Sequence, residues 1–259
     1  MAFLKQLCLL RLSKITNKMG RLIPSSCALC GTAGEALLCA ACRHQYFDKV
    51  QTRCQQCAIP LEVHDGHLVC GECLSKQPGF DYTVVASNYS APLDQLILAL
   101  KFGHRLALSA LFSDLLRDAV LDDAMRRNVP ANGTQQHLPE ILCAVPLGRV
   151  RLSERGFNQS LEIAKLLAAQ LGISLEAELM HRVRETARQS SLHPDDRQKN
   201  VRHAFSLNEQ AIQRIQGKHI GVVDDVMTTG TTLHEIATLL KRFGAARVSN
   251  YVVARTPRH

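Results

Sequence analysis

Residues 220–233 read IGVVDDVMTTGTTL and place two adjacent carboxylates between an apolar run and a turn of threonines and one glycine. The apolar residues 220–223 predict a buried strand that ends at Asp224 and Asp225. After the turn, apolar residues recur at helical spacing and predict a helix: Leu233, Ile236, Ala237, Leu240 and Phe243. Such a turn presents backbone N–H groups at a helix N-terminus, where a phosphate is favoured. Because the two acids can accept hydrogen bonds from sugar hydroxyls or help to hold Mg²⁺, the segment predicts a site for a ribose 5-phosphate.

This segment resembles the phosphoribosyl-pyrophosphate (PRPP) motif of type I phosphoribosyltransferases, in which an apolar strand, paired acids and a Thr/Ser/Gly loop follow one another. Gly221 departs from the motif, because that position usually carries a larger aliphatic residue. The resemblance implies that Asp224 and Asp225 form the catalytic pair that holds the ribose hydroxyls. It also implies a 5-phosphate loop made by Met227, Thr228, Thr229, Gly230, Thr231 and Thr232. The alternative is an ordinary strand–turn–helix with Asp and Thr as helix caps. A Walker A loop is excluded, because no Gly-Lys-Ser/Thr follows the strand.

Eight of the ten cysteines form four Cys-x-x-Cys pairs in the first third of the chain: Cys27/Cys30, Cys39/Cys42, Cys54/Cys57 and Cys70/Cys73. In a chain expected to be cytoplasmic, this clustering favours metal binding over disulfides, and redox-active thiols are the competing interpretation. Two such pairs close one tetrahedral Cys₄ site, so four pairs predict two structural zinc ions. Sequential pairing would give zinc ribbons at residues 27–42 and 54–73. Interleaved pairing, as in a cross-brace, remains open.

The rest of the chain alternates strand and helix patterns. Apolar runs predict strands at residues 82–87, 140–145, 218–223 and 248–254, and helical spacing predicts helices at 93–100, 107–125 and 158–171, with a loop at 128–139. This alternation predicts an α/β fold with a mostly parallel sheet flanked by helices, in which ligands bind at the carboxyl ends of the strands. The expected domains are a helix or tail at 1–22, a double zinc ribbon at 23–78 and a phosphoribosyltransferase-like domain at 79–259. Cys143 falls in an apolar run and is expected to be a buried strand residue.

Basic residues follow the second of these strands. The loop at residues 146–159 carries Arg149, Arg151 and Arg155, which can pair bidentately with a pyrophosphate; a solvated basic loop is the alternative. Arg255 closes the last strand and is expected near the same rim. The polar, basic stretch 182–205 fits either a lid over the site or a surface for nucleic acid. Its histidines, His193 and His203, are expected to be solvated.

The formal net charge of +8 suits a protein that handles polyphosphates or nucleic acid, but many other proteins share such a charge. No run approaches the roughly 20 apolar residues that span a bilayer, and Lys5 and Arg11 interrupt the N-terminal apolar residues. We therefore expect no membrane span, no signal peptide and a cytoplasmic protein. Residues 2–16 are expected to form an amphipathic helix that docks on the protein itself.

Four features together resemble the ComF family, which includes ComF-type competence proteins and GntX-type proteins associated with DNA utilisation. They are the Cys-x-x-Cys pairs after Pro24, the stretch from Tyr89-Ser90-Ala91-Pro92-Leu93 through Leu100-Lys101-Phe102, the segment Arg155-Gly156-Phe157-Asn158-Gln159, and the Asp-Asp-Thr/Gly motif. The resemblance covers nearly the whole chain from Pro24 onward. It implies a zinc-ribbon module on a type I phosphoribosyltransferase domain, PRPP and Mg²⁺ as ligands, and a role in DNA uptake, competence or DNA utilisation.

The resemblance leaves the activity open. One possibility is a phosphoribosyltransferase with an unknown acceptor. The alternatives are a non-catalytic module that binds single-stranded DNA or a recombination partner, and a regulatory protein that senses PRPP or a nucleotide. A glutamine-dependent amidotransferase is disfavoured, because residue 2 is Ala2 rather than the processed N-terminal cysteine of such enzymes.

Overall fold

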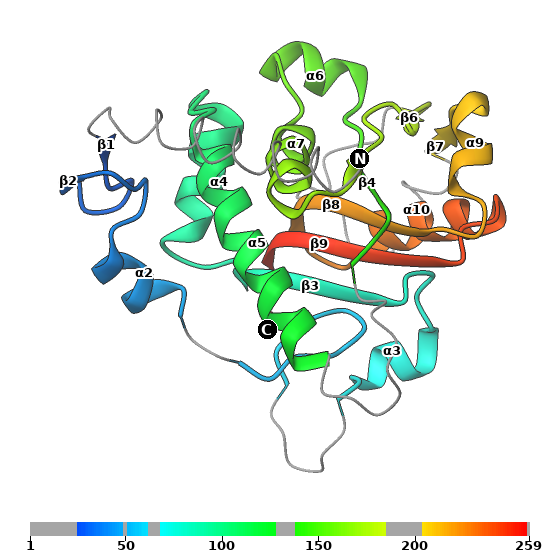
Figure 1. Ribbon diagram of the computed structural model, residues 1–259, viewed down its shortest axis with the longest axis horizontal. Helices are drawn as coiled ribbons and strands as arrows, with labels where there is room; N and C mark the ends of the chain where they lie inside the picture. Colours follow the sequence, from blue (N-terminus) through cyan, green and yellow to red (C-terminus); the bar gives the residue numbers. More distant parts are fainter. Residues whose placement is uncertain (1–24, 49–50, 62–67, 128–137, 185–203, 258–259) are drawn as a thin grey trace, which may run out of the picture. The chain divides into compact units, whose positions relative to one another are not determined.

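The computed structural model describes residues 25–48, 51–61, 68–127, 138–184 and 204–257 (Figure 1). The chain folds as two compact units, residues 1–49 and 50–259. The expected N-terminal helix, the histidines His193 and His203 and most of the stretch 182–205 lie outside the described residues. Among the described residues, no helix combines the length and apolarity that crossing a membrane requires.

The first unit contains one small cysteine module. Strand β1 (Ser25–Ser26) pairs antiparallel with β2 (Ala33–Gly34), and helix α2 (Ala40–Tyr46) follows. Cys39 caps the start of α2, because its side chain accepts a hydrogen bond from the backbone N–H of Cys42. Two pairs of cysteines are thus carried by a turn and by the first turn of a helix.

The second unit is built on a five-stranded, wholly parallel sheet in the order β3-β9-β8-β4-β5. Its strands are β3 (Tyr82–Asn88), β4 (Ile141–Ala144), β5 (Ser174–Leu175), β8 (His219–Met227) and β9 (Arg247–Arg255). The expected α/β fold with a mostly parallel sheet is therefore confirmed. The expected end of the strand at residue 223 is wrong, because β8 stays paired with β9 as far as Met227 opposite Arg255.

Helices connect the parallel strands. They are α4 (Leu93–Phe102), α5 (Leu108–Arg127), α6 (Arg149–Arg155), α7 (Gln159–Leu171), α9 (Glu209–Ile215) and α10 (Thr231–Arg242), whereas α3 (Gly71–Lys76) precedes β3. A two-stranded antiparallel ribbon, β6 (Met180–Arg182) with β7 (Phe205–Leu207), lies between β5 and α9 in the chain. The helix α6 corrects the sequence interpretation of residues 146–159, which were expected to form a loop throughout.

The direction of each crossover decides which face of the sheet its helix covers. The connections from β3 to β4 and from β4 to β5 run toward the β5 edge, whereas the connection from β8 to β9 runs toward the β3 edge. Because parallel crossovers are right-handed, α5 and α7 cover one face and α10 covers the other. Figure 1 shows α5 and α7 in front of the sheet.

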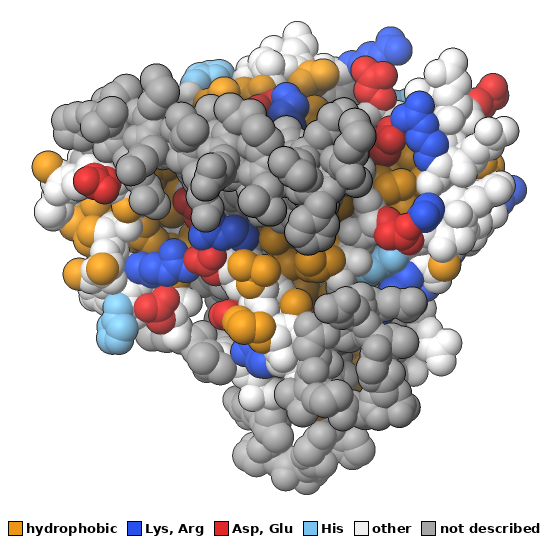
Figure 2. All heavy atoms as spheres, in the orientation of Figure 1, with side chains coloured by type: hydrophobic (Ala, Val, Ile, Leu, Met, Phe, Trp, Pro, Cys, Tyr) orange, Lys and Arg blue, Asp and Glu red, His pale blue; other side chains and the backbone are white. Residues whose placement is uncertain are grey.

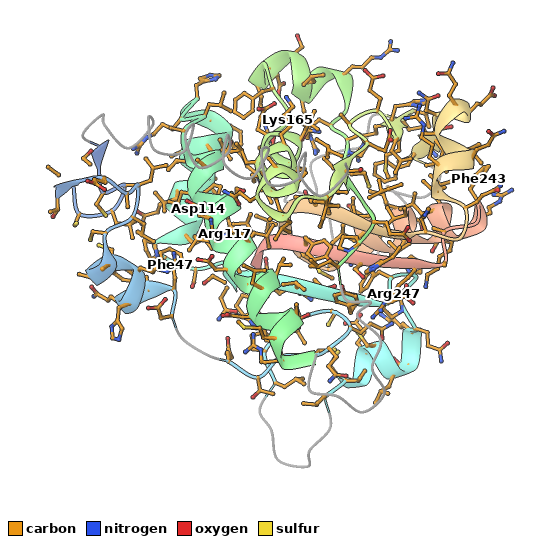
Figure 3. The ribbon with its side chains drawn as sticks, viewed as in Figure 1. Phe47, Asp114, Arg117, Lys165, Phe243 and Arg247 are labelled. Atoms are coloured by element: carbon orange, nitrogen blue, oxygen red, sulfur yellow. The ribbon has the colours of Figure 1, made fainter. Side chains whose placement is uncertain are left out.

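Polar contacts tie α5 to α7. Gln170 on α7 donates its Nε2 to Asp114 Oδ1 at 2.8 Å and accepts from Ser113 Oγ at 2.9 Å. Asp114 also pairs with Arg117 at 3.1 Å, and Figure 3 shows these two side chains together on α5. Both helices therefore form one layer over the sheet.

The second cysteine group packs into the core of the second unit. Cys54 and Cys73 belong to the same buried cluster as Phe80, Val222 of β8 and Leu233 of α10. This module is thus continuous with the sheet's α10 face, and the boundary expected at residues 78–79 falls inside the second unit. Cys143 is fully buried in β4, as expected, and burial raises the pKa of its thiol to about 12.

The departure at Gly221 has a packing cause. A Cβ atom at this position would lie 2.5 Å from Leu142 Cδ2, 2.7 Å from Tyr251 Cε2 and 2.8 Å from Pro139 Cγ. The Tyr251 ring, whose hydroxyl pairs with that of Tyr82 at 2.9 Å, occupies the space that a larger aliphatic would need. The small residue at 221 and the large one at 251 are therefore complementary.

Candidate functional site

The carboxyl ends of β4 and β8 form the point where the sheet's connections diverge. These two strands are neighbours, yet the chain leaves β4 toward the β5 edge and β8 toward the β3 edge. In open parallel sheets, ligands bind in the crevice at such a switch point. Asp224 and Asp225 lie near this end of β8, and the segment containing α6 and the start of α7 follows β4.

A small pocket that is open to solvent lies at the turn between β8 and α10. It is lined by Asp224, Val226, Met227, Thr228, Thr229, Gly230, Thr231, Thr232 and Leu233. Gly230 has a φ of 81° and occupies the N-cap position of α10, and the hydroxyls of Thr229 and Thr231 lie 2.9 Å apart. The first turn of α10 carries no acid. The N–H groups and the helix dipole therefore favour an anion in this pocket.

The two acids have different surroundings. Asp224 lines the pocket, and its Oδ1 accepts hydrogen bonds from Ser160 Oγ and from the backbone N–H of Asp225, both at 2.9 Å. Asp225 is only 5% exposed, and its Oδ2 contacts Gln159 Nε2 and Lys101 Nζ, both at 2.9 Å. Asp224 thus faces the pocket, whereas Asp225 is committed to contacts within the protein.

The environment raises the pKa of Asp224 to about 7. Burial is the main cause and the neighbouring charge of Asp225 adds to it, while the Ser160 hydroxyl and the Lys101 ammonium act in the opposite direction. Near neutral pH this carboxyl is therefore poised between its neutral and charged forms.

The start of α7 holds both acids in place. Asn158 caps α7 by accepting hydrogen bonds from the N–H groups of Ser160 and Leu161, and its Nδ2 donates to the carbonyl of Val145 after β4 at 3.0 Å. This cap fixes the helix end beside β4, so that residues 159 and 160 reach across to β8. The sequence analysis did not assign roles to Lys101, Gln159 or Ser160. The first two appear in the segments that carry the family resemblance, which was the available signal.

The three arginines expected to hold pyrophosphate lie on α6. Arg149 is exposed, Arg151 and Arg155 are partly buried, and the Arg155 guanidinium lies 5.1 Å from the centre of the Phe102 ring at the end of α4. Phe102 directly follows Lys101, so Arg155 is brought to the part of α4 that contacts Asp225. Such a cluster at a strand end can accept a polyanion.

Arg255 is buried beneath the turn. It is 4% exposed, and its Nη1 donates to the carbonyls of Met227 at 3.1 Å, Thr228, and Thr256 at 2.9 Å. Its Nε donates to the carbonyl of Cys57 at 2.9 Å. Arg255 therefore holds the backbone of the turn rather than offering its guanidinium to the pocket.

The eight cysteines gather into two groups in sequential order. Cys27, Cys30, Cys39 and Cys42 form one, and Cys54, Cys57, Cys70 and Cys73 form the other; within each, the sulfur atoms lie within 4.8 Å of one another. The Cys30–Cys39 and Cys57–Cys70 sulfur separations are both 3.7 Å. A tetrahedral zinc ion with Zn–S bonds of about 2.3 Å requires separations of about 3.8 Å. The structure thus favours sequential over interleaved pairing, and the two groups fit two structural zinc sites.

The two cysteine groups repeat one local design. The backbone N–H of Cys39 donates to Cys27 Sγ at 3.4 Å, and that of Cys70 donates to Cys54 Sγ at 3.3 Å. Each group's third cysteine occupies the N-cap position of a short helix. N–H donation to sulfur stabilises thiolates, which are the form that binds zinc.

Two family models match separate parts of the chain. A model described as a phosphoribosyl transferase domain matches residues 158–259, and one described as a double zinc ribbon domain matches residues 19–74. The first match covers the start of α7, the acids and the turn; the second covers both cysteine groups as far as Leu74.

Two curated relatives are similar over most of the chain. The DNA utilization protein YhgH of Escherichia coli (strain K12) is 38% identical over 238 residues, which cover 90% of this chain and 98% of that protein. Competence protein F of Haemophilus influenzae (strain Rd) is 34% identical over 222 residues, which cover 84% of this chain and 90% of that protein. Among solved structures, the glutamine PRPP amidotransferase of Bacillus subtilis, complexed with ADP and GMP, is 20% identical over 57% of this chain and 26% of that chain, with a TM-score of 0.35. A structural likeness at that level supports no inference.

Proposed function

The chain belongs to the ComF family, and from this premise we propose that it binds PRPP with Mg²⁺ at the turn between β8 and α10 and serves DNA uptake, competence or DNA utilisation. The names of its relatives concern competence and DNA utilisation. The ligand is proposed from the site itself, whose pocket combines a helix N-terminus with a carboxylate.

The observation that carries the proposal is that Asp224 and the threonine turn line the same pocket. The carboxyl and the turn line one pocket at the switch point of the sheet. In the proposed complex, the N–H groups and hydroxyls of residues 228–232 bind the 5-phosphate, and Asp224 accepts hydrogen bonds from the ribose hydroxyls. Asp225, held by Lys101 and Gln159, keeps Asp224 in register at the end of β8.

The donor set of the pocket fits Mg²⁺. Mg²⁺ prefers oxygen ligands and usually combines one or two carboxylates with substrate phosphates. Asp224 is the carboxylate that lines the pocket, and a bound cation favours its charged form although burial favours the neutral one. When bound, Mg²⁺ supplies charge neutralisation for the pyrophosphate.

Transfer of the phosphoribosyl group would follow from the same arrangement. Departure of pyrophosphate from the sugar builds positive charge on the ribose and negative charge on the leaving group, so electrostatic stabilisation and positioning are what the protein supplies. Arg149, Arg151 and Arg155 on α6 are proposed to contact the leaving group. No covalent nucleophile is required. Pyrophosphate release with added nucleobases would identify an acceptor.

A second candidate function is non-catalytic binding of single-stranded DNA or of a recombination partner, and helix α6 favours it. This helix exposes Arg149 together with Val150 and Leu152, which are 55% and 43% exposed. Exposed basic side chains on a helix suit the nucleic-acid backbone. On the face drawn in Figure 2, by contrast, Lys and Arg are interspersed with Asp and Glu rather than forming one basic field.

Calorimetric titration with PRPP, in the presence and absence of Mg²⁺, tests the proposal. Wild type should show saturable, Mg²⁺-dependent binding, and the double variant Asp224→Asn/Asp225→Asn should show none. Asp122→Asn, at an exposed position of α5, is the matched control and should bind like wild type. Equal affinities of wild type and the double variant would refute the assignment. PRPP binding without pyrophosphate release, together with DNA binding that weakens steeply with salt, would favour the second candidate.

A further inference from the structure

We propose that Arg255 couples the second cysteine group to the phosphate turn, so that zinc held by Cys54, Cys57, Cys70 and Cys73 is required for the turn to bind its anion. The inference rests on the proposed function, because it concerns the same turn. It assigns the second zinc ribbon to the ligand site as a structural support.

The contacts of Arg255 span the two features directly. One guanidinium nitrogen, Nε, donates to the carbonyl of Cys57, a residue 198 positions away in the sequence. Another, Nη1, donates to the carbonyls of Met227 and Thr228, which begin the turn. At 4% exposure, the side chain has little freedom to exchange these partners for water. A change in the position of Cys57 therefore acts on the turn through one rigid, planar group.

These hydrogen bonds also orient the groups that would bind a phosphate. The C=O and N–H of a trans peptide point in opposite directions. Because the carbonyls of Met227 and Thr228 point at Arg255, the N–H groups of Thr228 and Thr229 point away from it. Both threonines line the pocket. Arg255 is thus a positioning residue that fixes the direction of two candidate phosphate donors.

A second line of contacts joins the same two features. Gln56, between Cys54 and Cys57, donates its Nε2 to the carbonyl of Phe80 at 3.2 Å. The Phe80 ring lies directly under the turn: a Cβ atom on Gly230 would be 3.8 Å from its Cζ. The cysteine group, Phe80 and Met227 share one buried cluster. The turn therefore rests on the cysteine module by packing as well as by hydrogen bonds.

The charges of the module fit a loaded zinc site. A zinc ion bound by four thiolates has a net charge of about −2. Two guanidiniums donate to adjacent carbonyls at the end of the Cys54/Cys57 pair: Arg255 donates to Cys57, and Arg53 donates to Ala58 at 3.1 Å. Their two positive charges offset the thiolate site, so the loaded module holds Arg255 both by geometry and by charge. Loss of zinc would remove both the fixed arrangement of the four cysteines and the negative charge that faces Arg255.

The chain contains its own control. The first cysteine group has the same local design but belongs to the unit of residues 1–49. Cys30→Ser removes a ligand from that group, and Cys73→Ser removes a ligand from the second. Arg53→Met removes the cation beside Ala58 without removing any hydrogen bond to the turn.

Two measurements test the coupling. The first is the rate of zinc release to a chromogenic chelator in the Cys30→Ser background, where only the second group holds zinc. Arg255→Met should release this zinc at least about tenfold faster, because it removes a charged donor from a buried carbonyl, and Arg255→Lys should fall between. The second measurement is the affinity for ribose 5-phosphate by calorimetry. Arg255→Met and Cys73→Ser should each weaken it at least about tenfold, while Cys30→Ser and Arg53→Met leave it within about twofold.

The outcomes separate this inference from the proposed function. Unchanged zinc release in Arg255→Met overturns the coupling whether or not the ligand binds. Unchanged ribose 5-phosphate affinity in Cys73→Ser overturns it as well. Wild-type protein that binds neither ribose 5-phosphate nor PRPP contradicts the proposed function, and with it the ligand half of the inference; faster zinc release in Arg255→Met would then still support the link between Arg255 and the cysteine group. Circular dichroism of each variant shows that the fold is retained.

Discussion

Lys101 Nζ lies 2.9 Å from Asp225 Oδ2, so that the end of α4 is joined to the end of β8 by a largely buried ion pair. Gln159 Nε2 contacts the same oxygen. The two adjacent acids therefore have different roles: Asp225 makes contacts within the protein, whereas Asp224 lines the pocket. The paired acids are neighbours in sequence but not equivalents in structure.

Asp225→Asn should lower the free energy of unfolding by about 3 kcal/mol, because it leaves the Lys101 ammonium largely buried without its counter-ion. Urea denaturation at pH 7 measures the effect. The double variant Lys101→Met/Asp225→Asn should recover much of the loss, since it removes both charges. An Asp225→Asn protein as stable as wild type would show that the pair contributes little.

Asp224→Asn should show a stability difference from wild type that depends on pH. The native pKa of Asp224 is about 7, above the ordinary value for an aspartate, so the native state binds the proton more tightly than the unfolded state. Wild type therefore loses stability from this group as pH rises from about 4 to about 7. The variant has no such group, so its free energy of unfolding should rise relative to that of wild type across this pH range. Above about pH 7 the difference between the two proteins should stay constant. Thermal unfolding at pH 5, 6, 7 and 8 measures the gap; a gap independent of pH would contradict the raised pKa.

Gly230→Ala should destabilise the protein by about 1–2 kcal/mol, because residue 230 has a φ of 81° and an alanine is strained there. The same change should weaken ribose 5-phosphate binding about tenfold, because it shifts the turn. Gly172→Ala, at a φ of 68° with no atom near the added Cβ, carries the same backbone cost at the end of α7. It should show the backbone part of that loss, without the contact that the added Cβ at residue 230 makes with Met227 Cε at 2.5 Å, and it should leave the affinity unchanged. Calorimetry and urea denaturation of both variants separate the two effects.

Gly221→Val should lower the free energy of unfolding by about 1–3 kcal/mol, because the space beside β8 is filled by Tyr251 and Leu142. Restoring the usual aliphatic residue of the motif would thus harm this chain. The double variant Gly221→Val/Tyr251→Leu should be more stable than Gly221→Val alone. Urea denaturation of wild type, both single variants and the double variant tests this, and an additive result would mean that the two positions are not complementary.

Freshly purified protein should carry two zinc ions per chain by native mass spectrometry, one for each cysteine group. Cys30→Ser should carry one, and so should Cys73→Ser. Metal-free protein that was never oxidised would contradict the zinc assignment of both groups.

Local patterns in the sequence predicted the parallel sheet and the cysteine pairs well, because each depends on residues close together in the chain. The apolar runs gave the strands, although β8 extends to Met227 since pairing with β9 continues past the apolar residues. Residues 149–155 were interpreted as a loop because a seven-residue helix with no buried residue shows no apolar periodicity in the sequence; Gly156 ends this helix with a φ of 75°.

The remaining features depend on contacts between distant residues. Gln159 reaches Asp225 from 66 positions away, and Arg255 reaches Cys57 from 198 positions away. Arg255 was expected near the rim because it ends a strand. Only the folded structure shows that its side chain lies beneath the β8–α10 turn and points toward the cysteine group. The sequential grouping of the cysteines likewise follows from the fold, since their spacing in the sequence allows both pairings.

A crystal structure determined with PRPP and Mg²⁺ tests the central claim most directly. The account predicts the 5-phosphate within hydrogen-bond distance of the N–H groups of residues 228–232 and the ribose hydroxyls at Asp224. A structure at saturating ligand in which this pocket stays empty, or in which PRPP occupies another part of the molecule, would contradict it.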